Sequence, residues 1–149
     1  MLTGRFRGTH RRPFLRGIVR VPLFGIQQPV EFLVDTGADT SALMPRDSAR
    51  LGIPFTQLAR GPGSVGIGGP SNEYVARAAI SFLDSDGRIH SYLLDLAIVG
   101  AGPGVDVLPS LLGRDILNRW RMVYDPSIDE LSFEVHTADR TLAPRPPGR

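Results

Sequence analysis

The sequence predicts a mostly β domain with one or two short helices, and three observations lead to that prediction. The chain has 149 residues, a usual length for one domain with its own core. Its 17 glycines and 13 prolines divide it into short segments. Within these segments apolar residues partly alternate with polar ones or stand in short runs, which is typical of strands, and there is little helical periodicity.

Six segments have the pattern of a strand, and turn residues separate them in pairs. GIQQ, DSDG and DPSID each stand between two such segments, so three hairpins are expected. The predicted strands are residues 14–24, 30–34, 74–83, 89–99, 120–124 and 130–135.

Two short helices are predicted between these strands. Residues 45–51 (PRDSARL) favour one or two helical turns, because Pro45 suits the first helical position and Gly52 suits a helix end. Residues 115–120 predict a second short helix after Gly113. A glycine-rich loop is expected at residues 61–69.

Positive charge is concentrated near the N-terminus. All 17 basic residues are arginine, and six of them precede the first acidic residue, Glu31. We expect a basic arm over residues 1–13, the domain over 14–136, and a disordered tail over 137–149, which contains APRPPGR. A basic arm can bind nucleic acid, but no ladder of aromatic residues accompanies the arginines, so nucleic-acid binding is disfavoured.

Composition excludes or disfavours several classes of protein. The chain has no cysteine, which excludes disulfides, thiolate zinc sites and cysteine nucleophiles. No apolar run approaches the roughly 20 residues of a membrane span, and no apolar segment follows the charged N-terminus as in a secretory signal, so we expect a cytoplasmic protein. The three histidines are scattered, so neither a metal nor another cofactor is expected. Arginine without lysine indicates a GC-rich bacterial genome.

The segment FLVDTGADT, residues 32–40, carries the strongest functional signal. Its three apolar residues predict a buried strand, and Asp35 follows at the strand end. A second carboxylate beside Asp35 would share one proton with it, so one carboxylate could act as base and the other as acid on a water molecule. Two D-T-G loops are needed and the chain has one, which favours a C2 homodimer whose axis passes between two copies of Asp35.

Three glycine-containing stretches are similar to nucleotide-binding motifs, and each lacks part of its motif. Gly61, Gly63 and Gly66 fit G-x-G-x-x-G, but no apolar strand leads into them. AIVGAGPGV, residues 97–105, has valine where the third glycine of a dinucleotide motif belongs. D-T-G-A-D-T is similar to a phosphate loop of sugar kinases, which need two lobes and a longer chain. Nucleotide binding stays a weaker alternative.

FLVDTGADTSAL, residues 32–43, resembles the active-site segment of the retropepsin family, the single-domain homodimeric aspartic proteases of retroviruses and their cellular relatives. VGIGG, residues 65–69, resembles the tip of the family's flap, which closes over substrate. LLGRDIL, residues 111–117, resembles the segment before its helix. The resemblance covers residues 14–135. It implies an aspartic endopeptidase with a retropepsin-like acid-protease half-barrel, an active site at a C2 dimer interface and a flap around residues 61–70.

The resemblance also implies roles for individual residues. Asp35 would be the catalytic acid and base, Thr36 would join a hydrogen-bond clasp between the two loops, and the Gly37 carbonyl would accept a hydrogen bond from substrate. Asp39 would hold the peptide backbone of the substrate. The flap residues implied to contact substrate are Ile67, Gly68 and Gly69, and those implied to support the site are Gly113 and Arg114, with Arg114 paired to Asp39.

Some features depart from the family pattern. Thr40 stands where several viral enzymes have a second acid. Pro62 and Pro70 flank the flap glycines and are expected to stiffen or shorten the flap strands. The predicted hairpin over residues 120–135 is similar to that of relatives whose dimer interfaces use it, so the N-terminal arm is expected to be free.

A catalytically silent dimer of this fold, acting as a binding or assembly module, stays open as an alternative.

Overall fold

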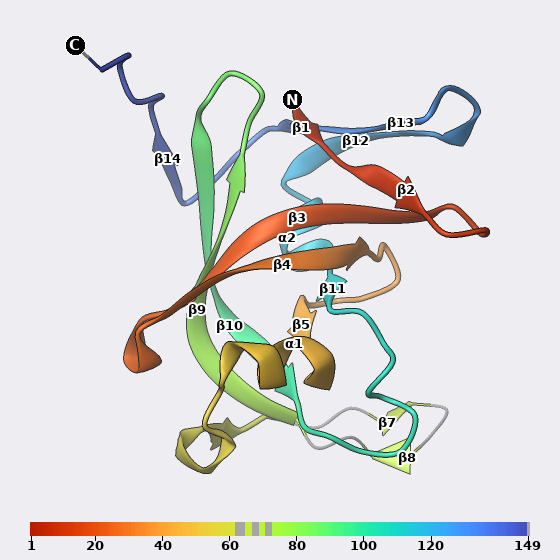
Figure 1. The fold of residues 1–149 in the computed structure, drawn as a ribbon, viewed down its shortest axis with the longest axis vertical. Helices are drawn as coiled ribbons and strands as arrows, with labels where there is room; N and C mark the ends of the chain where they lie inside the picture. The colour runs from red at the N-terminus through yellow and green to blue at the C-terminus, as the bar shows by residue number, and fades with distance from the viewer. Residues whose placement is uncertain (62–64, 67–68, 71–72, 149) are drawn as a thin grey trace.

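The fold of the chain is mostly β, as the sequence predicts (Figure 1). The computed structural model describes residues 1–61, 65–66, 69–70 and 73–148. Two short α-helices, α1 (Pro45–Leu51) and α2 (Arg114–Leu117), lie among the strands. No helix in this part of the chain is long and apolar enough to cross a membrane.

Six strands close into a barrel, and they are β3 (Arg12–Val21), β4 (Ile26–Val34), β5 (Ala42–Leu43), β9 (Glu73–Leu83), β10 (Ile89–Val99) and β11 (Leu111–Leu112). Neighbouring strands are hydrogen-bonded in the order β10, β5, β11, β4, β3 and β9. Because β9 also pairs with β10 along its whole length, the ring of strands is complete. The short strand β6 (Ala59–Arg60) pairs with β9 outside this ring.

The hydrophobic core fills the barrel, because alternate residues of each strand point inward. On β4, Val30, Phe32 and Val34 are buried, whereas Glu31 and Leu33 between them are partly exposed. The Phe-Leu-Val run that predicted a buried strand is therefore buried mainly on one face of β4.

The predicted hairpins are present, and one turn differs in position. Between β3 and β4 the chain turns through the short 3-10 helix η1 (Pro22–Phe24) and through Gly25, whose φ of 64° is left-handed. Glycine adopts this conformation without steric cost, so β4 begins at Ile26, inside the predicted GIQQ turn. The hairpin of β9 and β10 turns at Asp84–Gly87 as predicted, and Gly87 has a φ of 86°.

Both predicted helices form, and the second one is shorter than expected. α1 has the predicted bounds, and Gly52, whose φ is 73°, caps its C-terminal end. α2 ends at Leu117, because Trp120 begins the next strand, β12 (Trp120–Asp125), and is buried in the core. There the Trp120 Nε1 donates a hydrogen bond of 2.6 Å to the hydroxyl of Tyr92. Burying the indole with its N–H satisfied favours the strand over continued helix.

The N-terminal segment, expected as a free basic arm, is part of the folded domain. β1 (Leu2–Thr3) pairs with β13 (Glu130–Val135), which also pairs with β12, and β2 (Arg5–Arg7) pairs with β3. Leu2 is 1% exposed. The expectation was wrong for these strands. It rested on the arginines and on the resemblance of the hairpin over residues 120–135, and it overlooked the apolar residue that fixes the end of the chain.

The C-terminal segment also differs from its predicted disorder. β14 (Arg140–Leu142) pairs with the start of β10. Just before it, the carboxylate of Asp139 accepts hydrogen bonds from the Leu93 amide at 2.7 Å and from Arg119 Nη1 at 2.9 Å. The expectation failed here because these contacts come from β10 and from the segment between α2 and β12, which the composition of the tail does not reveal. Residues 143–148 contain no helix or strand.

We expect the stabilising effect of Asp139 to depend on pH. The hydrogen bond from the Leu93 amide, together with that from Arg119, lowers the pKa of Asp139. Its contribution is therefore present above the unfolded-state pKa of about 3.9 and is lost as pH falls through the lower folded-state value. Asp139→Asn should lower the free energy of unfolding near neutral pH, and its effect should shrink below about pH 4. Urea unfolding across this range measures it, and an effect independent of pH would contradict the expectation.

Candidate active site

Asp35 lies directly after β4, where that strand leaves the barrel. The strand end is held by β11, which runs parallel to it, and the Asp35 amide donates to the Leu112 carbonyl at 3.0 Å. The Asp35 side chain is partly exposed, and its Oδ1 accepts a hydrogen bond of 2.9 Å from the Gly37 amide. The Ala38 amide donates to the Asp35 carbonyl at 3.2 Å, which closes a tight turn. The backbone of Asp35 is therefore fixed on both sides, and its carboxylate, oriented by the Gly37 amide, can be reached from solvent.

A buried network ties the loop after Asp35 to the start of α2. Asp115 accepts hydrogen bonds from the Ser41 amide at 2.9 Å and from the Ser41 hydroxyl at 2.8 Å. The same hydroxyl accepts one of 3.0 Å from the Gly113 amide. Ser41 is fully buried, so its amide and hydroxyl would destabilise the fold if they lacked hydrogen-bond partners, and these bonds supply them. The sequence prediction missed Ser41 and treated Asp115 only as the first residue of the second predicted helix.

A second network, also missed, connects α1 to the strand that precedes Asp35. The Ser110 hydroxyl donates to Asp47 at 2.6 Å and accepts from the Met44 amide at 3.0 Å. The Ser110 carbonyl accepts from the Leu33 amide at 2.8 Å. Ser110 and Asp47 are both buried. No motif in the sequence links these residues, so only the fold could bring them together.

The predicted ion pair between Asp39 and Arg114 is present. Arg114 Nη2 contacts Asp39 Oδ1, and Arg114 Nη1 donates a hydrogen bond of 2.7 Å to the Thr36 carbonyl. One guanidinium group thus binds two points of the loop that follows Asp35. The pair lies on the surface of the single chain, because the side chains of Asp39 and Arg114 are 85% and 39% exposed.

Because this pair is exposed, Arg114→Ala should have only a small effect on stability. Exposed ion pairs contribute about 0–1 kcal/mol, so we expect the free energy of unfolding to fall by less than about 1 kcal/mol. Urea unfolding of the variant measures the effect. Arg77→Ala is a matched surface control, because Arg77 also pairs with an exposed carboxylate, that of Asp95. A loss of about 3–5 kcal/mol, as found when a buried pair is broken, would contradict the expectation.

The glycine-rich segment forms a hairpin of its own in the part that the structure describes. β7 (Val65–Gly66) pairs antiparallel with β8 (Gly69–Pro70). Figure 1 shows the pair apart from the barrel. Gly69 lies in β8, whereas the predicted substrate contacts Ile67 and Gly68, as well as Pro62, lie outside the described residues.

The stretch at residues 97–105 does not form the opening of a dinucleotide-binding fold. β10 ends at Val99, and residues 100–110 form turns and irregular chain that lead to β11. A dinucleotide-binding motif needs a helix directly after its glycines. The structure therefore removes this support for nucleotide binding.

The structure brings most of the predicted residues into one region around the end of β4. Backbone and side-chain hydrogen bonds join the loop at residues 35–41 to the segment at residues 112–115. The predicted residues gathered there are Asp35, Thr36, Gly37, Asp39, Gly113 and Arg114.

Comparisons with known proteins agree with this geometry. A family model described as aspartyl protease matches residues 19–116. The chain is similar in structure to a retropepsin-like aspartic protease from Rickettsia conorii, with 21% identity and a TM-score of 0.54, over 86% of this chain and 86% of that chain. It is also similar to EIAV protease complexed with the inhibitor HBY-793, with 23% identity and a TM-score of 0.51, over 75% of this chain and 90% of that one. No curated protein matches the sequence.

Proposed function

The chain belongs to the aspartyl protease family and has a retropepsin-like fold, and we propose that it is a homodimeric endopeptidase with one Asp35 from each subunit at its catalytic centre. The observation that carries the proposal is the setting of Asp35. Its carboxylate stands at the end of a barrel strand, oriented by the Gly37 amide and open to solvent on one side. A single carboxylate so placed is half of an acid–base pair.

A C2 axis beside Asp35 would supply the other half. Two equivalent carboxylates in contact cannot both be ionised at low cost, so they hold one proton between them. The charged carboxylate takes a proton from water, and the oxygen of that water attacks the carbonyl carbon of the peptide bond. The other carboxylate gives its proton to the substrate. The C–N bond then breaks after proton transfer to the nitrogen, which yields a carboxylic acid and an amine.

The neighbouring residues would position the substrate. In the proposed complex Thr36 joins the two loops across the axis, the Gly37 carbonyl accepts a hydrogen bond from the peptide, and Asp39, kept in place by Arg114, binds the peptide backbone. The glycine-rich hairpin closes as a flap, with backbone groups of residues 67–69 over the substrate. Gly113 supports the site by letting the loop and the segment before α2 lie close together.

Cleavage of a broad peptide library tests the proposal directly. Internal peptide bonds should be hydrolysed, as read by mass spectrometry, without added metal or cofactor. A protein that binds peptides from the library and cleaves none would favour the catalytically silent module instead.

The activity should depend on protein concentration, because each subunit holds half of the site. Specific activity should fall on dilution, at the concentrations where sedimentation shows the dimer dissociating into monomers. An active monomer, with rates proportional to protein concentration down to the nanomolar range, would contradict the shared site.

A further inference from the structure

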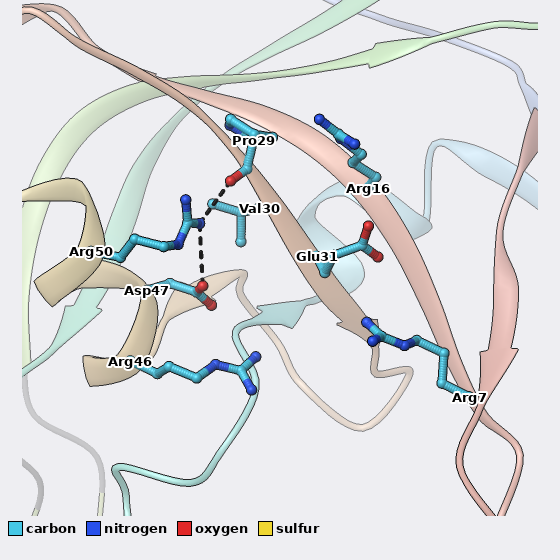
Figure 2. A pocket seen from close by; sticks show the side chains of 8 residues that line it. All are labelled: Arg7, Arg16, Pro29, Val30, Glu31, Arg46, Asp47 and Arg50. Atoms are coloured by element: carbon cyan, nitrogen blue, oxygen red, sulfur yellow. Dashed lines mark hydrogen bonds and ion pairs between the residues drawn. The ribbon is translucent and has the colours of Figure 1, made fainter.

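A concave site apart from the Asp35 loop is rich in arginine (Figure 2). It has a volume of about 420 Å³ and lies between α1, β4 and the strands β2 and β3. We call it the arginine pocket, and its charged residues are Arg7, Arg16, Glu31, Arg46, Asp47 and Arg50. In Figure 2 the side chains of Arg7 and Arg46 point toward the middle of the pocket from opposite sides.

The positive charges of the arginine pocket outnumber its negative ones by four to two. Both carboxylates already have partners. Asp47 is 5% exposed and is bound by the Ser110 hydroxyl and by Arg50, whereas Glu31 pairs with Arg5 at 3.0 Å. Within the described part of the chain, neither Arg16 nor Arg46 pairs with a carboxylate. Arg16 lies opposite Glu31 in the register of β3 and β4, but the guanidinium groups of Arg16 and Arg46 are not held in an ion pair with the described residues, and the pocket has an excess of two positive charges.

Guanidinium groups recognise carboxylates and phosphates through paired hydrogen bonds, and two observations favour carboxylates here. First, phosphate sites usually also use free backbone amides, and the first turn of α1 offers few. Pro45 has no N–H, and the amides of Asp47 and Ser48 donate to the Met44 carbonyl. Second, arginine–carboxylate pairs already form here: Arg50–Asp47 lies within the pocket, and Glu31 of the pocket pairs with Arg5 beside it.

We propose that the arginine pocket binds the acidic side chains of a peptide segment. Glu31 lies on β4 and precedes Asp35, just past the end of that strand, by four positions, which is about 13 Å at the usual rise of about 3.3 Å per residue. An extended peptide spans this distance with about four residues. The pocket is thus suited to an acidic stretch of a protein substrate that lies outside the cleaved bond. The assignment of the segment to a substrate rests on the proposed function, whereas binding of an acidic peptide does not.

Fluorescence anisotropy with a labelled oligoglutamate peptide tests the proposal, and oligoglutamine serves as the uncharged control. The protein carries Asp35→Asn, so that cleavage cannot disturb the measurement. Oligoglutamate should bind saturably and more weakly as salt rises. The double variant Arg16→Ala/Arg46→Ala should weaken binding at least about tenfold, since it removes the charge-assisted hydrogen bonds of two guanidinium groups. Glu31→Gln should tighten binding, because it removes a negative charge from the pocket.

A matched double variant separates the pocket from the overall charge. Arg77→Ala/Arg121→Ala also removes two positive charges, from exposed side chains that do not line the pocket. Its binding should stay within about twofold of the parent, because these side chains do not line the pocket and salt screens the interactions of exposed charges. Equal weakening by both double variants, or no saturable binding, would overturn the proposal. Saturable binding of pyrophosphate without binding of oligoglutamate would also overturn it and identify a phosphate site. A failure to cleave the peptide library would count against the proposed function alone.

Discussion

Asp35→Asn should abolish peptide hydrolysis and leave the fold intact. In a homodimer the substitution removes both the acid and the base, so we expect a loss of at least about 10⁴-fold, given about 10²–10⁴-fold for one such group. Asparagine has nearly the same volume, and its side-chain oxygen can still accept the hydrogen bond from the Gly37 amide. The free energy of unfolding should therefore change little.

The measurement is the rate of cleavage of one peptide identified from the library, with purified wild type and variant compared at the same concentration. Asp95→Asn is a matched control, because it makes the same change on the exposed side chain of a surface ion pair. It should retain full activity. Substantial cleavage by Asp35→Asn, in a preparation free of contaminating protease, would end the proposal of a shared carboxylate pair. It would also point to a hydrolase whose site lies elsewhere.

Features that depend on residues close in sequence could be predicted. The bounds of α1 followed from Pro45 and Gly52, whose preferences are local. The turn at residues 84–87 followed from similar local chemistry. The Asp39–Arg114 pair is long-range, and it could be predicted only because the resemblance to the retropepsin family linked two motifs.

Features that depend on closure of the barrel could not be predicted in this way. Ser41 and Asp115 meet because β11 inserts between β4 and β5, and no spacing in the sequence indicates that insertion. The same holds for Ser110 and Asp47. A short polar residue in a loop has many possible partners, so its burial is decided by the tertiary structure.

The ends of the chain show the limit of reasoning from composition. Arginine and proline suggested a free arm and a disordered tail, and both segments contribute edge strands instead. Leu2 alone supplies the burial that fixes β1, and Asp139 supplies the contacts that precede β14. One well-placed side chain can outweigh the composition of its segment, because the strand that it joins, β13 or β10, is already ordered and only two or three residues lose their backbone freedom.

Gly113→Ala should destabilise the protein and disrupt the active site together. A Cβ at residue 113 would lie 2.5 Å from the carbonyl carbon of Thr40, 2.7 Å from its oxygen and 2.9 Å from the Ser41 nitrogen. These are backbone atoms that cannot rotate away, so the loop at residues 36–41 must move from the segment before α2. The φ of Gly113 is −96°, so the expected effect comes from this close approach and not from a left-handed backbone.

The movement should break the hydrogen bonds that hold Ser41, which is fully buried. Overpacking costs about 1–3 kcal/mol, and leaving a buried polar group unsatisfied costs about 1–3 kcal/mol more, so the free energy of unfolding should fall by roughly 2–6 kcal/mol. Gly102→Ala is a matched control, because its Cβ would approach only the Val105 side chain, at 3.7 Å. That variant should stay within about 0.5 kcal/mol of wild type and remain active. If Gly113→Ala and Gly102→Ala had the same free energy of unfolding and the same rate of peptide cleavage, the expectation that close packing at Gly113 positions Asp35 would be wrong.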